Sequence, residues 1–163
     1  MEVHFNSFSP HKKLVKPIHC CLCNRKINNI MDAHDPEPLD KNLDQLKEEV
    51  LKSNSDLGIA VDPDVDRLVF VSENGETISE ENTLISCADY ILSKEKGSAV
   101  SNLSSSMGLR DVCKMYGVEY FSSMVGEINV VEKMKSVNAI IGGEGNGGII
   151  YPESHYGRDA LVG

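Results

Sequence analysis

The sequence contains no tryptophan, few other aromatic residues, and fewer basic than acidic residues. Aromatic side chains make up 6% of the 163 residues, so a base-stacking surface for single-stranded nucleic acid is not expected. Sixteen Lys and Arg residues against 25 Asp and Glu residues give a formal net charge of −9, which repels nucleic acid and anionic membranes. The sequence therefore predicts neither a nucleic-acid partner nor a membrane partner.

Long apolar runs are also absent. No segment approaches the ~18 consecutive apolar residues of a membrane span, and the basic N-terminal region is not followed by the apolar core of a signal peptide. Apolar residues make up 40% and charged residues 25%, a balance typical of globular proteins. We therefore expect a globular, cytoplasmic protein.

The five cysteines lack the spacing of a zinc finger. Cys20, Cys21 and Cys23 lie close together, whereas Cys87 and Cys113 occur singly within helix-like patterns. Cysteine and the adjacent histidine are usual zinc ligands, but no second Cys/His pair follows at a finger-like distance. Reduced thiols are the favoured interpretation in the absence of a signal peptide, and a zinc site at the N-terminal cluster is the alternative.

The character of the chain changes near residue 35. Residues 1–34 are basic, hold four of the five histidines and show no sustained periodicity, so this segment stays unassigned. From residue 35 onward, strand patterns alternate with helix patterns. Strands are expected at 57–61, 68–71, 99–100, 118–121 and 139–141, and helices at 39–50, 79–96, 109–116 and around 130–134. This alternation predicts a layered α/β architecture.

Three aspartates at alternate positions lie between the first two predicted strands. The carboxylates of Asp62, Asp64 and Asp66 repel one another unless a cation or solvent disperses their charge. Ligand sets made only of oxygen suit Mg²⁺ or Ca²⁺. An EF-hand is disfavoured, because Arg67 stands where its sharp turn requires glycine and because the flanks are strand-like. Metal binding is the favoured interpretation, and a solvated acidic turn is the alternative.

A second distinctive segment, residues 142–148, is rich in glycine. Its letters fit G-x-G-x-x-G, but residues 149–152 read as extended chain where a dinucleotide site needs a helix, and Glu144 would face the pyrophosphate. The segment instead offers Glu144 and Asn146 beside backbone that a ligand can approach closely, which suits sugar hydroxyls. A tight glycine turn with both side chains solvated is the alternative.

Together the two segments resemble loops of the α-D-phosphohexomutases, the family of phosphoglucomutase, phosphomannomutase and phosphoglucosamine mutase. The sequence Asp-Pro-Asp-Val-Asp-Arg at 62–67 is similar to the metal-binding loop of that family. The sequence Gly-Glu-Gly-Asn-Gly-Gly at 143–148 is similar to its sugar-recognition loop, in the spelling of the phosphoglucosamine mutase-like branch. The order and separation of the loops also agree, as do residues 125–127 and 157–159. The resemblance extends over about residues 34–163.

The resemblance implies Mg²⁺-dependent interconversion of a hexose 1-phosphate and a hexose 6-phosphate. It implies that Asp62, Asp64 and Asp66 bind one Mg²⁺ ion, and that Arg67 supports catalysis by holding the transferring phosphoryl group. The residues that it implies for sugar binding are Gly126, Glu127, Glu144, Gly145 and Asn146.

The resemblance also implies an architecture, a layered mixed sheet with helices on its faces, in incomplete phosphohexomutase-type domains. Residues 35–76 are expected to form the C-terminal part of domain 2, and residues 77–163 most of domain 3. A long helix is expected to start near Arg158, so Arg158 and its neighbour His155 are interpreted as structural residues.

The sequence departs from the family where the phosphoryl group is carried. The family uses a phosphoserine in a Ser-His-Asn-Pro-like motif, and the serines at 104–106 have no neighbouring His or Pro. Many members place a His after the sugar-loop glycine, where this chain has Gly148. We therefore expect a fragment of a phosphohexomutase with no turnover by itself, whose partners are a hexose phosphate and the missing phosphoserine domains on another chain.

Two other functions stay open. The chain is alternatively a non-catalytic module that binds Mg²⁺ or a phosphosugar, or the relic of a split gene. A Ca²⁺-binding protein is a weaker option. The sequence does not specify which hexose is bound.

Overall fold

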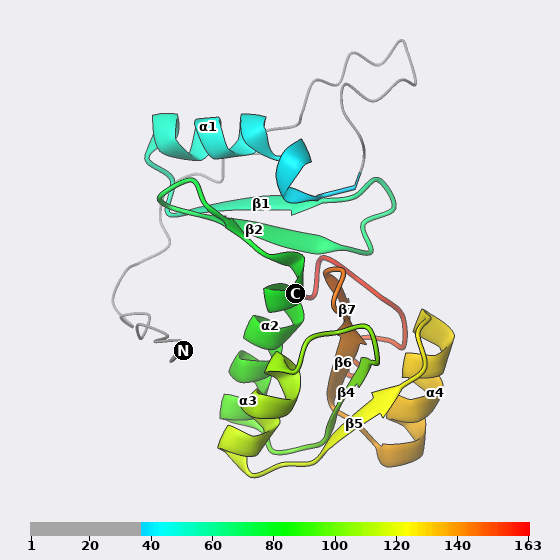
Figure 1. Cartoon of the computed structure of the whole chain (residues 1–163). Helices are drawn as coiled ribbons and strands as arrows, with labels where there is room; N and C mark the ends of the chain where they lie inside the picture. Colours follow the sequence, from blue (N-terminus) through cyan, green and yellow to red (C-terminus); the bar gives the residue numbers. More distant parts are fainter. Residues whose placement is uncertain (1–36) are drawn as a thin grey trace. The chain divides into compact units, whose positions relative to one another are not determined.

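The computed structural model describes residues 37–163, which form two β-sheets with helices packed against them (Figure 1). The predicted zinc alternative at Cys20, Cys21 and Cys23 lies outside the described residues. Within the described part of the chain, no helix is both long enough and apolar enough to span a membrane.

The first sheet is antiparallel and is covered by a helix on one face. Its strands are β1 (Leu57–Val61), β2 (Leu68–Ser72) and β3 (Thr77–Ile78), in the order β1-β2-β3. A short 3-10 helix, η1 (Asp40–Asn42), and helix α1 (Asp44–Ser53) precede the strands. Val50 of α1 packs with the buried Val69 and Val71 of β2, whereas Ile59 on the other face of β1 is 56% exposed.

The second sheet is mixed, and each of its parallel strands is followed or preceded by a helix. Its elements are α2 (Glu80–Lys94), β4 (Ala99–Asn102), α3 (Gly108–Tyr116), β5 (Tyr120–Ser123), α4 (Glu127–Val137), β6 (Ile141–Glu144) and β7 (Gly148–Ile150). The strand order is β5-β4-β6-β7, with β4 parallel to β5 and to β6, and β7 antiparallel to β6. The predicted mixed α/β sheet is therefore confirmed.

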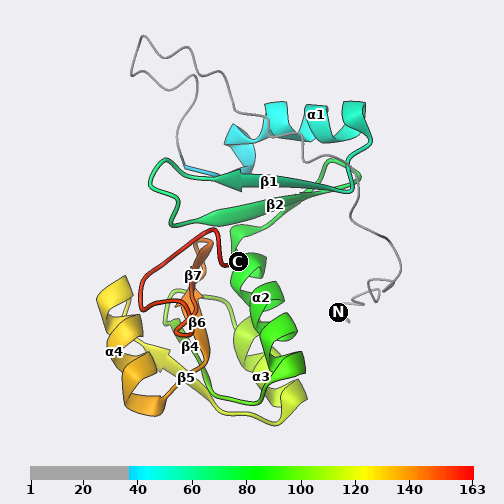
Figure 2. The ribbon, with the colours of Figure 1, turned by 180° about the vertical axis from the view of Figure 1, so that it is seen from behind.

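Helices cover both faces of this second sheet, α2 and α3 on one side and α4 on the other (Figures 1 and 2). Because successive strand residues point to opposite faces, Ala99 packs toward α2 and α3 while Val100 packs toward α4. Ile149 and Ile150 divide in the same way. The two apolar layers hold the carboxyl ends of β4 and β6 side by side, and polar residues follow at those ends.

Two sequence expectations differ from the structure. Strand β6 begins at Ile141, two residues later than expected, and includes the glycines at 142 and 143. The helix expected to start near Arg158 is not present, because Arg158 instead forms an isolated β-bridge with Ile150. The backbone N–H of Arg158 donates to Glu127 and that of Asp159 donates to the Ile149 carbonyl, so these groups take no part in a helix.

Candidate functional site

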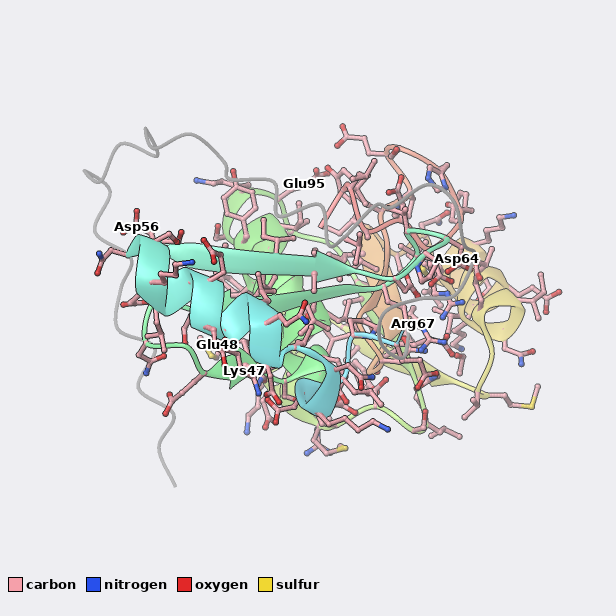
Figure 3. The ribbon with its side chains drawn as sticks, turned by 90° about the horizontal axis from the view of Figure 1, so that it is seen from above. Lys47, Glu48, Asp56, Asp64, Arg67 and Glu95 are labelled. Atoms are coloured by element: carbon pink, nitrogen blue, oxygen red, sulfur yellow. The ribbon has the colours of Figure 1, made fainter. Side chains whose placement is uncertain are left out.

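The aspartate-rich loop joins β1 to β2 and is organised around Asp62. The carboxylate of Asp62 is buried, and its Oδ1 atom accepts hydrogen bonds of 3.0 Å from the backbone N–H groups of Asp66 and Arg67. Val65 adopts a φ of +59°, which a β-branched residue rarely does, so the loop is tightly constrained. In Figure 3, Asp64 and Arg67 lie beyond the same end of the β1–β2 pair, opposite the end where Asp56 lies.

The three aspartates of this loop come together in space. One carboxylate oxygen from each of Asp62, Asp64 and Asp66 can be chosen so that all three lie within 4.8 Å of one another. Among residues 37–163, this is the one group of three or more Asp, Glu, His or Cys side chains that could hold a metal ion. All three donors are carboxylate oxygens, so the set fits a hard cation such as Mg²⁺.

The electrostatics of this loop reflect its crowding. Burial and the neighbouring Asp62 carboxyl raise the pKa of Asp66 to about 6, although Arg158 acts in the opposite direction. Burial also disfavours ionisation of Asp62, but hydrogen bonds from Arg67 and Asp66 hold the pKa of Asp62 below its ordinary value. The loop thus stabilises one of the two charges at the expense of the other, and a bound cation would stabilise both.

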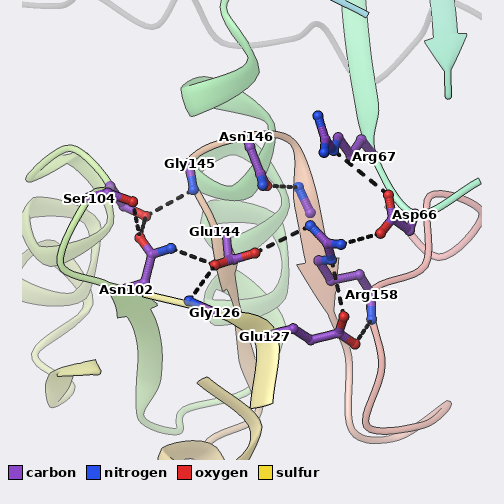
Figure 4. Close-up of polar contacts among 12 residues, drawn as sticks. Asp66, Arg67, Asn102, Ser104, Gly126, Glu127, Glu144, Gly145, Asn146 and Arg158 are labelled. Atoms are coloured by element: carbon purple, nitrogen blue, oxygen red, sulfur yellow. Dashed lines mark hydrogen bonds and ion pairs between the residues drawn. The ribbon is translucent and has the colours of Figure 1, made fainter. Parts of the chain in front are cut away.

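Arg67 turns its guanidinium group toward these carboxylates. Its Nη1 atom lies 3.2 Å from Oε1 of Glu37, and its Nε atom lies 3.4 Å from Oδ2 of Asp62. Its Nε atom also lies 3.8 Å from Oδ1 of Asp66 (Figure 4). The structure therefore places Arg67 against the loop that carries the candidate metal ligands, with its side chain about one quarter exposed.

Glu144, at the end of β6, is held by three groups from distant parts of the sequence. Its Oε1 atom accepts hydrogen bonds from Nδ2 of Asn102 at 2.6 Å and from the backbone N–H of Gly126 at 3.1 Å. Its Oε2 atom lies 3.2 Å from Nη1 of Arg158 (Figure 4). Glu144 is buried, so the alternative of a solvated Glu144 on a glycine turn is wrong.

The turn between β6 and β7 is fixed by its own side chain and by neighbouring loops. The backbone N–H of Gly145 donates to Oγ of Ser105 at 2.9 Å, and Oδ1 of Asn146 accepts from the backbone N–H of Gly148 at 3.1 Å. Gly147 has a φ of +90°, and a Cβ atom there would lie 2.7 Å from the carbonyl oxygen of Leu68. Because this turn packs directly against β2 and needs a positive φ, only glycine fits at position 147.

The start of α4 supplies the remaining predicted sugar-binding residues. Gly126 precedes the helix with a φ of +112° and directs its N–H at Glu144. Glu127 accepts a hydrogen bond from the backbone N–H of Arg158 at 3.1 Å, and its Oε2 atom lies 3.3 Å from Nε of Arg158. The structure thus gathers Gly126, Glu127 and Glu144 into one hydrogen-bonded cluster.

Arg158 links this cluster to the aspartate loop, which the sequence reasoning did not anticipate. Its guanidinium group forms ion pairs with Asp66, Glu127 and Glu144, and its side chain is 16% exposed (Figure 4). The signal that pointed to it was the match of residues 157–159 to the family, which was interpreted as a helix start. His155 lies nearby in sequence but is half exposed, with its Nε2 atom 3.0 Å from Oδ2 of Asp159.

Asn102 is a second residue that the sequence reasoning missed. It is 1% exposed, donates to Glu144 and accepts hydrogen bonds from Oγ of Ser104 and Ser105 at 2.9 and 2.8 Å. The available signal was a polar residue at the carboxyl end of a parallel strand, where α/β sheets commonly bind ligands. The hydroxyl groups of Ser104 and Ser105 therefore orient the Asn102 amide, which in turn donates to Glu144.

Comparison with known proteins gives the same assignment for both halves of the chain. The family model for phosphoglucomutase/phosphomannomutase, alpha/beta/alpha domain III, matches residues 79–163. The model for alpha/beta/alpha domain II matches residues 11–75. The domain II match thus begins upstream of residue 34, where the motif-based resemblance begins.

Individual relatives agree with the family models. The chain is 38% identical over 131 residues to a phosphoglucomutase/phosphomannomutase of Thermococcus kodakarensis, which covers 80% of this chain and 29% of that protein. It is 36% identical over 157 residues to a phosphoglucosamine mutase of Methylococcus capsulatus, covering 95% of this chain and 34% of that protein. The chain thus spans about one third of the length of these curated relatives.

A solved structure shows the same fold. The crystal structure of a phosphoglucomutase/phosphomannomutase family protein from Burkholderia thailandensis superposes with a TM-score of 0.71 at 25% identity, covering 80% of this chain and 29% of that one. Sequence and fold therefore lead to one conclusion: this chain belongs to the phosphoglucomutase/phosphomannomutase family, of which it carries sequence matching domains II and III.

Proposed function

We propose that this chain supplies the metal-binding and sugar-binding parts of a phosphohexomutase, which interconverts hexose 1-phosphates and hexose 6-phosphates. The observation that carries the proposal is the position of Arg158, whose single guanidinium group contacts both the aspartate loop, at Asp66, and the buried Glu144. The two loops are thus close enough for one hexose phosphate to contact both. Membership of the family supports the same reaction class.

In this proposal, Asp62, Asp64 and Asp66 hold one Mg²⁺ ion. The ion supplies positive charge that offsets the negative charge of the transferring phosphoryl group. Arg67 lies against the same loop and presents a planar guanidinium group, whose paired N–H donors match phosphate oxygens. Its role is to hold the phosphoryl group in place beside the aspartates.

Glu144 and Asn146 bind the sugar in this proposal. The Glu144 carboxylate is fixed by Asn102, Gly126 and Arg158, so it is already oriented to accept hydrogen bonds from sugar hydroxyls. Two hydroxyl contacts on one side of the ring would let the sugar bind in either of two orientations. Either the 1-position or the 6-position, with its phosphate, would then face the metal loop. Gly126 contributes the backbone N–H that holds the Glu144 carboxylate, and the backbone of Gly145 packs against the carboxylate of Glu81.

We further propose that the chain has no turnover by itself, since its sequence contains no Ser-His-Asn-Pro-like motif to carry the phosphoryl group. The alternative is a non-catalytic module that binds Mg²⁺ or a phosphosugar, and the same missing motif favours it. The two differ in whether phosphoserine domains from another polypeptide restore turnover when they are mixed with this chain.

The test begins with calorimetric titration of Mg²⁺ into the purified chain. Saturable binding that Asp64→Asn abolishes would support the metal site, and Asp56→Asn, at the other end of β1, is the matched control. Tighter binding of Ca²⁺ than of Mg²⁺ would instead favour a Ca²⁺-binding protein.

The second measurement is a coupled mutase assay with glucose, mannose and glucosamine phosphates, primed with a hexose bisphosphate. We expect no turnover by the chain alone, and turnover after addition of a polypeptide that carries the phosphoserine domains of a relative. Robust turnover by the pure chain would contradict the proposed dependence on other domains. Phosphosugar binding without turnover in the mixture would establish the non-catalytic alternative.

A further inference from the structure

The side chain of Arg158 occupies the position between the two loops that the proposed function uses. It forms ion pairs with Asp66 on one side and with Glu127 and Glu144 on the other, and it is mostly buried (Figure 4). Three carboxylates around one mostly buried guanidinium group offset its charge, although its Nε atom makes no hydrogen bond among the described residues. Arg158 is therefore a fixed positive charge beside a candidate cation site.

The carboxylate of Asp66 takes part in both the candidate cation site and the ion pair with Arg158. It belongs to the aspartate triad, and it also forms the ion pair with Arg158. A divalent ion bound by the triad would draw on the same carboxylate and would be repelled by the guanidinium group. The ion and Arg158 thus compete for the charge of Asp66.

Glu144 offsets part of the charge of Arg158 on the side away from Asp66. The Nη1 atom of Arg158 lies 3.2 Å from Oε2 of Glu144, so part of the guanidinium charge is offset on the sugar-loop side. Loss of that carboxylate would leave more of the positive charge to be offset by Asp66. One side chain thus contacts carboxylates of both the sugar loop and the metal loop.

We propose that Arg158 is a positioning residue that couples the two loops: it weakens divalent-cation binding at Asp66, and Glu144 moderates this effect. The inference rests on the proposed function, since it takes the aspartate triad as the cation site. It adds a role for Arg158, which contacts both the aspartate loop and the sugar loop. It also predicts a direction that a purely structural arginine would not give.

The test measures the affinity for Mn²⁺ by titration. The electron paramagnetic resonance signal of the free ion reports how much Mn²⁺ stays unbound. Arg158→Gln removes a positive charge at contact range, so Mn²⁺ binding should become tighter by on the order of tenfold. Arg158→Lys, which keeps the charge, should bind Mn²⁺ more nearly as the unaltered chain does. Arg110→Gln, an exposed arginine on α3, is the matched control and should leave the affinity unchanged.

A double-mutant cycle separates coupling through Arg158 from simple loss of charge. Glu144→Gln should weaken Mn²⁺ binding in the unaltered chain, and this effect should become much smaller when Arg158→Gln is also present. Effects of the same size in both backgrounds would overturn the coupling. Unchanged or weaker Mn²⁺ binding by Arg158→Gln would overturn the competition.

A second measurement covers the case in which Arg158→Gln does not fold. Addition of Mg²⁺ to the unaltered chain should shift the Nε–H nuclear magnetic resonance signal of Arg158 and leave that of Arg110 in place. An unshifted Arg158 signal at saturating Mg²⁺ would overturn the inference while leaving the metal site intact. Failure of every variant and of the unaltered chain to bind either ion would overturn both the metal site and the inference.

Discussion

Asn102 and Glu144 form a side-chain hydrogen bond of 2.6 Å, and these residues are only 1% and 6% exposed. They stand at the carboxyl ends of β4 and β6, which are neighbours in the second sheet. The amide donates to a carboxylate, and hydrogen bonds of this charged kind are stronger than neutral ones. The orientation of the candidate sugar-binding carboxylate is therefore fixed by the core of the sheet before any ligand binds.

Replacing Asn102 by alanine should destabilise the fold. Asn102→Ala removes a donor from the buried Glu144 carboxylate and an acceptor from two serines, so we expect a loss of ~2–3 kcal/mol in the free energy of unfolding. Urea denaturation followed by circular dichroism measures the loss. Asn82→Ala, at an exposed position of α2, is the control and should change the stability by less than about 0.5 kcal/mol. Equal effects of the two substitutions would argue against the buried network.

The turn of the β6–β7 hairpin gives a second prediction. Gly147→Ala combines a positive φ with a clash against the Leu68 backbone, whereas Gly117→Ala has a positive φ of +66° but nothing within 4 Å of the new methyl group. Gly117→Ala should cost ~1 kcal/mol, and Gly147→Ala should cost about 1–3 kcal/mol more. Chemical denaturation of both variants measures the difference. A difference near zero would mean that the turn does not pack against β2 as described.

Thiol reactivity tests the packing of α2 and α3. Burial raises the pKa of the Cys87 thiol and of the Cys113 thiol to about 11, from an ordinary value of 9.0. A thiol with a raised pKa keeps its proton to higher pH. Near pH 8 the reactive thiolate fraction of these cysteines is therefore about a hundredfold lower than that of a cysteine with the ordinary pKa. Iodoacetamide labelling, read by peptide mass spectrometry, should be slow near pH 8, accelerate toward pH 11 and become fast in guanidinium chloride. Rapid labelling of folded protein near pH 8 would contradict this packing.

Divalent ions should stabilise the protein if the aspartate triad binds them. An ion that binds only the folded state adds about 2.7 kcal/mol at a concentration one hundred times its dissociation constant. The melting temperature should therefore rise with Mg²⁺ concentration in the unaltered chain and in Asp56→Asn, but not in Asp64→Asn. A similar rise in all three proteins would indicate general screening of the acidic surface rather than a specific site.

Most of the fold could be predicted because local patterns determine it. The apolar residues of α2 recur with helical spacing, and the glycine after α3 adopts the left-handed conformation that ends a helix. Strand β6 was placed two residues early, since glycines at 142 and 143 have low strand propensity and join the strand only through pairing with β4 and β7.

The candidate site was predicted less completely, for a related reason. Asp62, Asp64 and Asp66 are close in sequence, so their spacing alone indicated a cluster. The partners of Arg158 lie 92, 31 and 14 positions away, at Asp66, Glu127 and Glu144, and no local pattern predicts such contacts. The motif at 157–159 was visible, but its role depends on tertiary structure.

Strand β1 lies at an edge of its sheet within residues 37–163, and on the face opposite α1 its Leu57, Ile59 and Val61 side chains are 42%, 56% and 42% exposed. An open strand edge next to apolar side chains favours pairing between copies of a chain. The net charge of −9 opposes such encounters at low ionic strength. Salt screens that repulsion, so the colloidal stability of the purified protein should decrease as the ionic strength of the buffer increases.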